Sequence, residues 1–243
     1  MSLRGRSALL ALLLSCAASL PAFAGILVPY VRVDFGANML DLPSVDQQVR
    51  QEEELFYDSG LIVDFDGAGP ALGLSGSAGL WLFPGFRVGA TWSDARSKVN
   101  NKVELSGFNY ADQFQFRMKD VGGEAAIRIP RLRGLTFGGS IAQTKADMSE
   151  HYALENVHGT YYETETLERT GRTYGGFIGL DQTNASGVAG YVRVGFQRRD
   201  LGSMPTRLTV TDNGTTTVTE GAPFSMDYTG YYVKAGVGFD LLW

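Results

Sequence analysis

Apolar and polar residues alternate strictly along the last thirteen residues of the chain. One face of this stretch is apolar and aromatic, and consists of Tyr231, Val233, Ala235, Val237, Phe239, Leu241 and Trp243. The other face carries glycine and charge, including Lys234 and Asp240. A period of two indicates a β-strand with one apolar face. A strand whose opposite face holds mainly glycine and charged residues fits a closed barrel that is apolar outside and polar inside.

Seven earlier stretches show the same alternation, over residues 27–38, 71–83, 86–92, 121–129, 135–141, 173–181 and 188–197. In the fourth, Val121 and Ile127 share the apolar face, but upstream Phe114, Phe116 and Met118 have the opposite parity. A slip of one residue in the strand register would bring both sets onto one face. The pattern therefore predicts a β-bulge near Lys119-Asp120.

The connections between these strands alternate in length. Three are short turns, near residues 84, 132 and 185, and four are long, over 39–70, 93–113, 145–172 and 198–228. Short periplasmic turns and long extracellular loops are typical of outer-membrane barrels. A soluble lipocalin-like barrel would need its apolar side chains inside, whereas the inward set here is glycine, serine, threonine and charge. The sequence predicts an all-β fold, one eight-stranded antiparallel up-and-down transmembrane β-barrel. A ten-stranded barrel is the alternative if Leu61–Phe65 forms a membrane strand of its own.

The N-terminus has the features of a secretory signal peptide. Arg4 and Arg6 precede an apolar run, and Ala22-Phe23-Ala24 is a small-x-small cleavage site. We therefore expect a cleaved signal over residues 1–24 and one barrel domain over 25–243. A membrane anchor and lipidation at Cys16 are the alternatives. Cleavage removes Cys16, the one cysteine, which excludes disulfide chemistry in the mature chain.

Charge and hydropathy exclude two further classes. Cleavage removes two of the 21 basic residues and leaves 19 against 26 acidic ones, dispersed along the chain, so no nucleic-acid partner is expected. The mean hydropathy of −0.06, with no long apolar run after Arg32, excludes an α-helical membrane protein.

Three segments carry a resemblance to a known family: Tyr30 to Gly36, Phe83 to Gly89, and Gly236 to Trp243. They resemble the small eight-stranded outer-membrane barrels that include OmpA transmembrane domains, opacity proteins, OmpX and OmpW. The resemblance spans the mature chain, is specific for the architecture and weak for the activity. It implies a bacterial outer-membrane location and contact with lipid and lipopolysaccharide. It also implies recognition of the C-terminal strand by the barrel-assembly machinery.

Nine ionisable residues have inward parity: Arg32, Asp34, Arg87, Glu124, Arg128, Asp181, Arg193, Lys234 and Asp240. Their charges nearly balance, and an eight-stranded lumen is only wide enough for side chains to fill. Since unpaired buried ions are strongly destabilising, we expect a network of ion pairs that plugs the lumen. The alternative is a narrow conduit with Trp81 and Phe177 as constrictions.

The outward face predicts how the barrel sits in its membrane. Trp92 and Tyr231 are expected in the outer aromatic girdle, and Phe86 and Trp243 in the inner one. Arg96, Lys98 and Arg198 have outward parity near the outer rim. We expect these three to contact lipopolysaccharide phosphates.

The sequence gives little support for a catalytic site or a metal site. The two histidines, His151 and His158, lie in the third long connection. Lipid A deacylases of this architecture carry His-x-Ser on a strand, whereas His158 is followed by Gly159-Thr160. No catalytic residue and no cofactor are therefore expected. The acidic run Glu52-Glu53-Glu54 could attract divalent cations near lipopolysaccharide, but it lacks EF-hand spacing, so a solvated acidic loop is favoured over a metal site.

The last long connection contains a hairpin signal, Asn213-Gly214 after Thr209-Val210-Thr211. It predicts a hairpin from Arg207 to Glu220 that protrudes beyond the membrane, and residues 160–167 suggest a second extension. Exposed strand edges invite a partner to add a strand. The favoured function is therefore a non-enzymatic structural or adhesin-like surface role. OmpW-like passage of small or hydrophobic solutes is the alternative, and lipid A modification is the least favoured.

Overall fold

A computed structural model describes residues 27–39, 43–58, 60–66, 69–83, 85–129, 132, 134–225 and 228–241. The predicted signal peptide with Cys16 lies outside the described residues, and so does Trp243. Among the residues that are described, no helix has the length and apolar character needed to cross a membrane.

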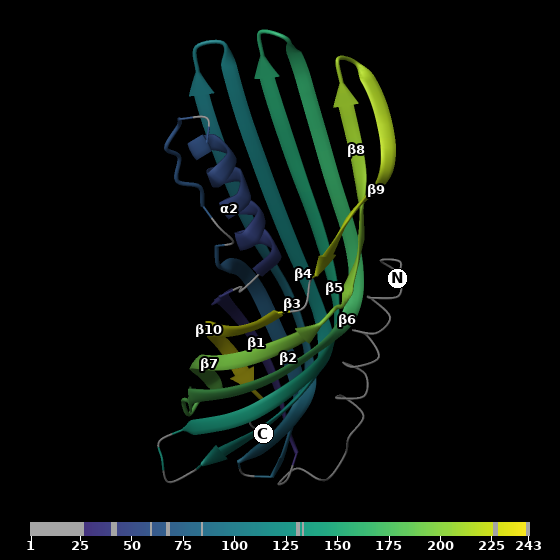
Figure 1. Cartoon of the computed structure of the whole chain (residues 1–243). Helices are drawn as coiled ribbons and strands as arrows, with labels where there is room; N and C mark the ends of the chain where they lie inside the picture. Colours follow the sequence, from purple (N-terminus) through teal and green to yellow (C-terminus); the bar gives the residue numbers. More distant parts are fainter. Residues whose placement is uncertain are drawn as a thin grey trace.

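The described residues form ten strands and one helix (Figure 1). The elements are β1 (Val28–Asn38), α2 (Pro43–Asp58), β2 (Ala71–Phe83), β3 (Phe86–Leu105), β4 (Phe108–Ile129), β5 (Leu135–Asn156), β6 (Gly159–Thr183), β7 (Val188–Asp200), β8 (Ser203–Asp212), β9 (Thr215–Ser225) and β10 (Tyr228–Asp240). The segment 61–66 has no strand structure, so the ten-stranded membrane barrel is wrong.

Eight of the strands close into a ring. Each of β1 to β6 pairs with the next strand in an antiparallel ladder, and β10 pairs with both β7 and β1. This confirms the predicted eight-stranded antiparallel barrel. The hairpin β8–β9 stands outside the ring, because β8 pairs with the upper part of β6. It turns at Asn213 and Gly214, both with positive φ as a type I′ turn requires.

Around the lower ring the exposed face is apolar. Val237 on β10 and Val121 on β4 are 62% and 64% exposed, and Phe239 and Val194 show the same pattern. Inward glycines let charged side chains cross the narrow lumen: a Cβ on Gly238 would come within 2.6 Å of Arg32 Cγ. A ring that turns its apolar side chains outward and its charges inward is suited to hydrocarbon as its surroundings.

The strands from β3 to β6 extend far above this apolar ring (Figure 1). They contain 20, 22, 22 and 25 residues, whereas crossing a bilayer takes about 9–11 tilted residues. Roughly half of each strand therefore lies outside the membrane. The expected long connections 93–113 and 145–172 are mostly strand, and the predicted extension at 160–167 is part of β6.

The apolar face of β4 changes sides without any break in its register. Phe114, Phe116 and Met118 are buried inside, while Val121 is exposed outside. Pairing of β4 with both neighbours runs unbroken through Lys119 and Asp120, so the predicted β-bulge is wrong. The surroundings change instead: below this level lipid covers the outside, and above it water does.

Neighbouring strands change sides at the same height. Ala95 on β3 and Ala146 on β5 are both buried inside and both pair with Met118. On β6 the first apolar inward residue above the ring is Leu167, also buried. The same strands therefore build a transmembrane barrel below and an extracellular sheet with an apolar inner face above.

Helix α2 covers that inner face (Figure 1). Val45, Val49 and Phe56 repeat at helical spacing and are buried in one core with Phe114 and Phe116 of β4. The expected solvated loop at 39–70 is therefore partly wrong. Its apolar residues dock a helix, and the acidic residues of α2 are divided between the buried and the exposed sides.

Candidate functional site

The lower lumen contains the nine predicted inward charges, joined in ion pairs. Asp181 Oδ2 accepts hydrogen bonds from Arg32 and, at 2.8 Å, from Arg87, and its Oδ1 forms an ion pair with Arg128 at 3.1 Å. Asp240 lies 3.4 Å from Arg32 and 4.0 Å from Arg128. All of these side chains except Arg128 are almost fully buried.

The remaining charges extend this network upward. Glu124 pairs with Arg193 at 3.1 Å and with Arg87 at 3.5 Å. Asp34 lies 4.0 Å from Lys234 and accepts hydrogen bonds from Ser75 and, at 2.7 Å, from Tyr191. Every carboxylate of the network therefore meets at least one cation.

Aromatic rings fill the space between these arginines. The Arg128 guanidinium lies 4.4 Å from the centroid of Trp81, and Arg193 lies 4.8 Å from Phe177 and 4.6 Å from Tyr191. Such contacts stabilise a desolvated guanidinium. The sequence suggested Trp81 and Phe177 as constrictions of an alternative conduit. In the structure both rings pack against arginines of the charged layer.

Above the charged layer the lumen holds a second set of polar contacts, centred on Asp120. Asp120 accepts from Arg199 at 2.6 Å, from Ser93 at 2.7 Å and from Thr144 at 2.7 Å. The cavity beside these groups holds only about 70 Å³. The apolar core under α2 begins at the next level, with Met118 and Ala146.

The outer rim is basic on its lipid-side face. Arg96 and Arg198 have side chains 65% and 67% exposed, and each pairs with an outward carboxylate, Asp94 or Asp200. Lys98 is also exposed. The sequence prediction missed four further outward cations. It placed Lys145 and Arg172 in the predicted loop 145–172, and it did not assign Arg117 and Lys119 to a face. Ladder pairing puts Arg117 beside Arg96 and Lys145 beside Lys119.

Aromatic residues lie just below this basic rim. Trp92 and Tyr231 are exposed on the outward face, and the Tyr231 ring meets Phe196 at 5.6 Å. At the lower edge Phe86 is half-buried on the outward face of β3, while Trp243 lies outside the described residues.

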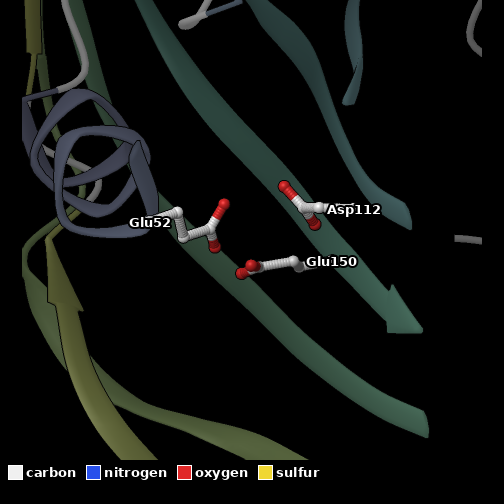
Figure 2. Close-up of side chains that lie close together, drawn as sticks. All are labelled: Glu52, Asp112 and Glu150. Atoms are coloured by element: carbon white, nitrogen blue, oxygen red, sulfur yellow. The ribbon is translucent and has the colours of Figure 1, made fainter. Parts of the chain in front are cut away.

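A cavity of about 370 Å³ opens between α2 and the extracellular sheet. Its walls combine aromatic rings with carboxylates: Phe56, Phe108, Tyr110 and Tyr152, with Glu52, Glu150, Glu163 and Glu165. At its inner end Glu52, Asp112 and Glu150 point toward one another (Figure 2). The sequence reading considered Glu52 only as part of an acidic loop, and missed Asp112 and Glu150.

Burial and like charge act together on these carboxylates. Burial, then the neighbouring Glu52, raises the pKa of Asp112 to about 7. Burial, then Asp112, Glu165 and Glu52, raises the pKa of Glu150 to about 8. Two hydrogen bonds act in the opposite direction: the Gln48 amide lowers the pKa of Glu150, and the Gln113 backbone N–H lowers that of Asp112.

The two histidines are exposed on the β5–β6 hairpin. His151 Nδ1 lies 3.2 Å from Thr164 Oγ1, and the His158 backbone N–H donates to Asn156. A catalytic triad needs a nucleophile, a base and an orienting carboxylate within hydrogen-bond reach. Among the residues described, neither histidine ring has a hydrogen-bonded carboxylate.

No protein-family model and no curated protein matches the sequence. Among solved structures, a major outer membrane protein from Thermus thermophilus is similar, with a TM-score of 0.52 and 11% identity over 87% of this chain and 99% of that one. The outer membrane protease OmpT from Escherichia coli (TM-score 0.49, 11% identity, 91% and 99% covered) and Ail of Yersinia pestis (TM-score 0.45, 9% identity, 88% and 97% covered) also match. The likeness to the Thermus thermophilus protein, at 11% identity, shows the fold alone, that of a small bacterial outer-membrane β-barrel.

Proposed function

We propose that this chain is a non-enzymatic protein of the bacterial outer membrane that presents an extracellular sheet to a partner at the cell surface. The single observation that carries the proposal is the open edge of that sheet. Its strand order ends at β9, which pairs only with β8 among the described strands. An unpaired strand edge offers main-chain groups to which an extended segment of a partner can add.

The exposed tip of β9 suits strand addition. Its residues 215–220 are all exposed, four of them are threonines, and Val218 is 53% exposed. Threonine and valine favour extended structure. Such an edge supplies affinity through the main chain, while side chains on alternate faces select the partner.

A plugged lumen supports a surface role over transport. Five cations and four carboxylates pair across the lower lumen, and the arginines pack on aromatic rings. The apolar core under α2 covers this layer from above. Passage of a solute would require the ion pairs to separate in a poorly hydrated interior, which is strongly unfavourable. Planar-bilayer recordings are therefore expected to show no stable channel, and regular open-channel currents would contradict the plug.

The basic rim supports a location among lipopolysaccharide. Arg96, Lys98 and Arg198 lie just above Trp92 and Tyr231, at the level where phosphates meet the hydrocarbon boundary. Guanidinium and ammonium groups pair strongly with phosphate.

The histidine geometry supports a non-enzymatic role. His151 and His158 lie on an exposed hairpin and lack an orienting carboxylate among the described residues. A mass spectrum of lipid A from cells that express the protein is expected to match that of cells without it.

The partner site is tested by removing one outward N–H from β9. In a two-residue hairpin the pair next to the turn, Asp212 and Thr215, exchanges both ladder hydrogen bonds, and the pairs alternate from there. The N–H of Val218 therefore points to the open edge, and that of Thr217 points to β8. Val218→Pro removes a docking donor and leaves the hairpin ladder intact, whereas Thr217→Pro breaks the ladder.

Adhesion of bacteria that display each variant to cultured epithelial cells and to one another is then measured. Val218→Thr, which keeps the N–H, is the matched control and is expected to bind like the wild type. Val218→Pro is expected to lose most of the binding. Equal adhesion by Val218→Pro and the wild type would contradict strand addition at this edge. Deletion of 207–220 is less informative, because it exposes the β6 edge in place of β9.

A further inference from the structure

Three carboxylates from three different elements converge beneath α2. Glu52 comes from the helix, Asp112 from β4 and Glu150 from β5, and their side chains point toward a common centre (Figure 2). One oxygen of each lies within 4.8 Å of the others. Two oxygens that bind the same Ca²⁺ at 2.3–2.6 Å are at most about 5.2 Å apart. The observed spacing therefore fits three ligands of one ion.

No cationic side chain among the described residues neutralises this cluster. No described lysine or arginine forms an ion pair with Glu52, Asp112 or Glu150, and the main influences on their pKa values are burial, other acids and hydrogen bonds. Like charges this close, and removed from water, repel one another strongly. A bound proton or a bound cation is needed to relieve this repulsion.

One buried oxygen of the cluster has no hydrogen-bond partner among the residues that the structure describes. Asp112 is only 6% exposed, and its Oδ1 atom has no hydrogen-bond partner. Glu52 accepts from the Tyr110 hydroxyl at 2.5 Å and Glu150 accepts from the Gln48 amide, so these two are each oriented by one donor. A buried carboxylate oxygen left without a donor is strongly unfavourable in a protein, unless a cation is its partner.

We propose that Glu52, Asp112 and Glu150 form the binding site of one hard divalent cation of the Ca²⁺ class. Hard divalent cations prefer oxygen ligands, and Ca²⁺ completes six to eight of them with water. The adjacent cavity of about 370 Å³ supplies room for that water, and Glu163 and Glu165 line it.

The site ties α2 to the extracellular sheet. Glu52 is its only ligand from the helix, and Asp112 and Glu150 face it from neighbouring strands. With the cation bound, the charge that would push α2 away becomes a contact that holds it. The divalent-cation concentration outside the cell would thereby set how firmly the helix covers the apolar core.

Terbium luminescence tests the site directly, because Tb³⁺ takes the place of Ca²⁺ and is sensitised by nearby tyrosine. Tyr110 donates to the ligand Glu52, and Tyr152 packs against Tyr110 at 5.3 Å. Full-length protein folded in lipopolysaccharide-free detergent and stripped with a chelator is expected to bind one Tb³⁺, and Ca²⁺ is expected to displace it. Asp112→Asn and Glu150→Gln are each expected to weaken binding at least about ten-fold. Glu104→Gln, an exposed acid on β3, is the matched control and should bind like the wild type.

Hydrogen exchange over residues 43–58 gives a second readout. The difference in exchange rate between Asp112→Asn and the wild type should have opposite signs in chelator and in Ca²⁺. In chelator, Asp112→Asn relieves like-charge repulsion, so its α2 should exchange more slowly than that of the wild type. In Ca²⁺, the order should invert. A wild type that gives no tyrosine-sensitised signal, or a variant carrying Glu52→Gln, Asp112→Asn and Glu150→Gln that binds Tb³⁺ as tightly as the wild type, would overturn the site. Heat-dependent gel mobility checks that each variant is folded.

Discussion

Replacement of Asp181 by asparagine is expected to destabilise the barrel more than any change at its charged surface. This carboxylate is 3% exposed and forms ion pairs with three arginines, Arg32, Arg87 and Arg128. The substitution keeps the shape of the side chain and removes its charge, so two buried cations and one partly exposed cation lose their shared partner.

The expected loss in the free energy of unfolding depends on the ion pairs that the three arginines retain after the substitution. Removal of one partner from a buried ion pair costs about 3–5 kcal/mol. Here Arg32 retains Asp240 at 3.4 Å, Arg87 retains Glu124 at 3.5 Å and Arg128 retains Asp240 at 4.0 Å. Because these longer contacts remain, we expect a loss near the lower end, about 3 kcal/mol.

The assay is reversible urea unfolding in phospholipid vesicles, followed by tryptophan fluorescence and gel mobility. Asp200→Asn is the matched control. Its pair with Arg198 is solvent-exposed, and exposed pairs contribute about 0–1 kcal/mol. If Asp181→Asn shifted the free energy of unfolding by no more than this control, the lumen network would not hold the barrel together as argued.

Three further outcomes are expected. In chelator, the hydrogen-exchange protection factors of α2 should fall as pH rises from about 4 to about 8 and then level off. The reason is that the pKa values of Asp112 and Glu150 are raised to about 7 and about 8 from their ordinary values of 3.8 and 4.5. Protection factors that stay constant across this range would contradict the prediction. Phe116→Ala should destabilise the extracellular part by about 3–5 kcal/mol, since Phe116 is 1% exposed, and exchange in the upper strands should rise while the gel shift of the barrel persists. Gly238→Ala should slow refolding or destabilise the barrel by about 1–3 kcal/mol, because its Cβ would meet Val31 O at 2.5 Å; unchanged stability would argue against close packing there.

The membrane ring could be predicted from sequence because its strands obey a period of two against a uniform solvent. On β7 the apolar residues Val192, Val194 and Phe196 all face lipid, and Arg193 and Gln197 face the lumen. One rule, apolar outward, therefore assigns the valines and the charged side chains of this strand correctly. The same rule placed the nine lumen charges on one side, and the structure joins them in ion pairs.

The extracellular half could not be predicted in this way because its solvent differs. Above Met118 the outside is water, so the same period of two continues with the apolar face inward. The assumption that apolar residues always face outward therefore led to the wrong prediction of a β-bulge and to predicted strands that were too short. The helical spacing of Val45, Val49 and Phe56 was present in the sequence, but the run of acids between them was read as a loop.

The carboxylate cluster was inaccessible to sequence for a related reason. Asp112 and Glu150 lie in segments taken for loops, about 40 residues apart, and meet only because β4 and β5 pair. Glu52 joins them through the docking of α2. Residues that meet only through long-range strand pairing show no characteristic spacing in the sequence from which the cluster could be predicted.

Cysteine accessibility along β4 measures the change of sides most directly. The predicted mature chain has no cysteine, so single substitutions at Phe116, Arg117, Lys119, Val121 and Gly123 can be labelled on intact cells with a membrane-impermeant maleimide. Arg117→Cys and Lys119→Cys should react, while Val121→Cys and Gly123→Cys, facing lipid, and Phe116→Cys, facing the core, should not. Labelling at Phe116→Cys with protection at Arg117→Cys would restore the bulge and contradict the account.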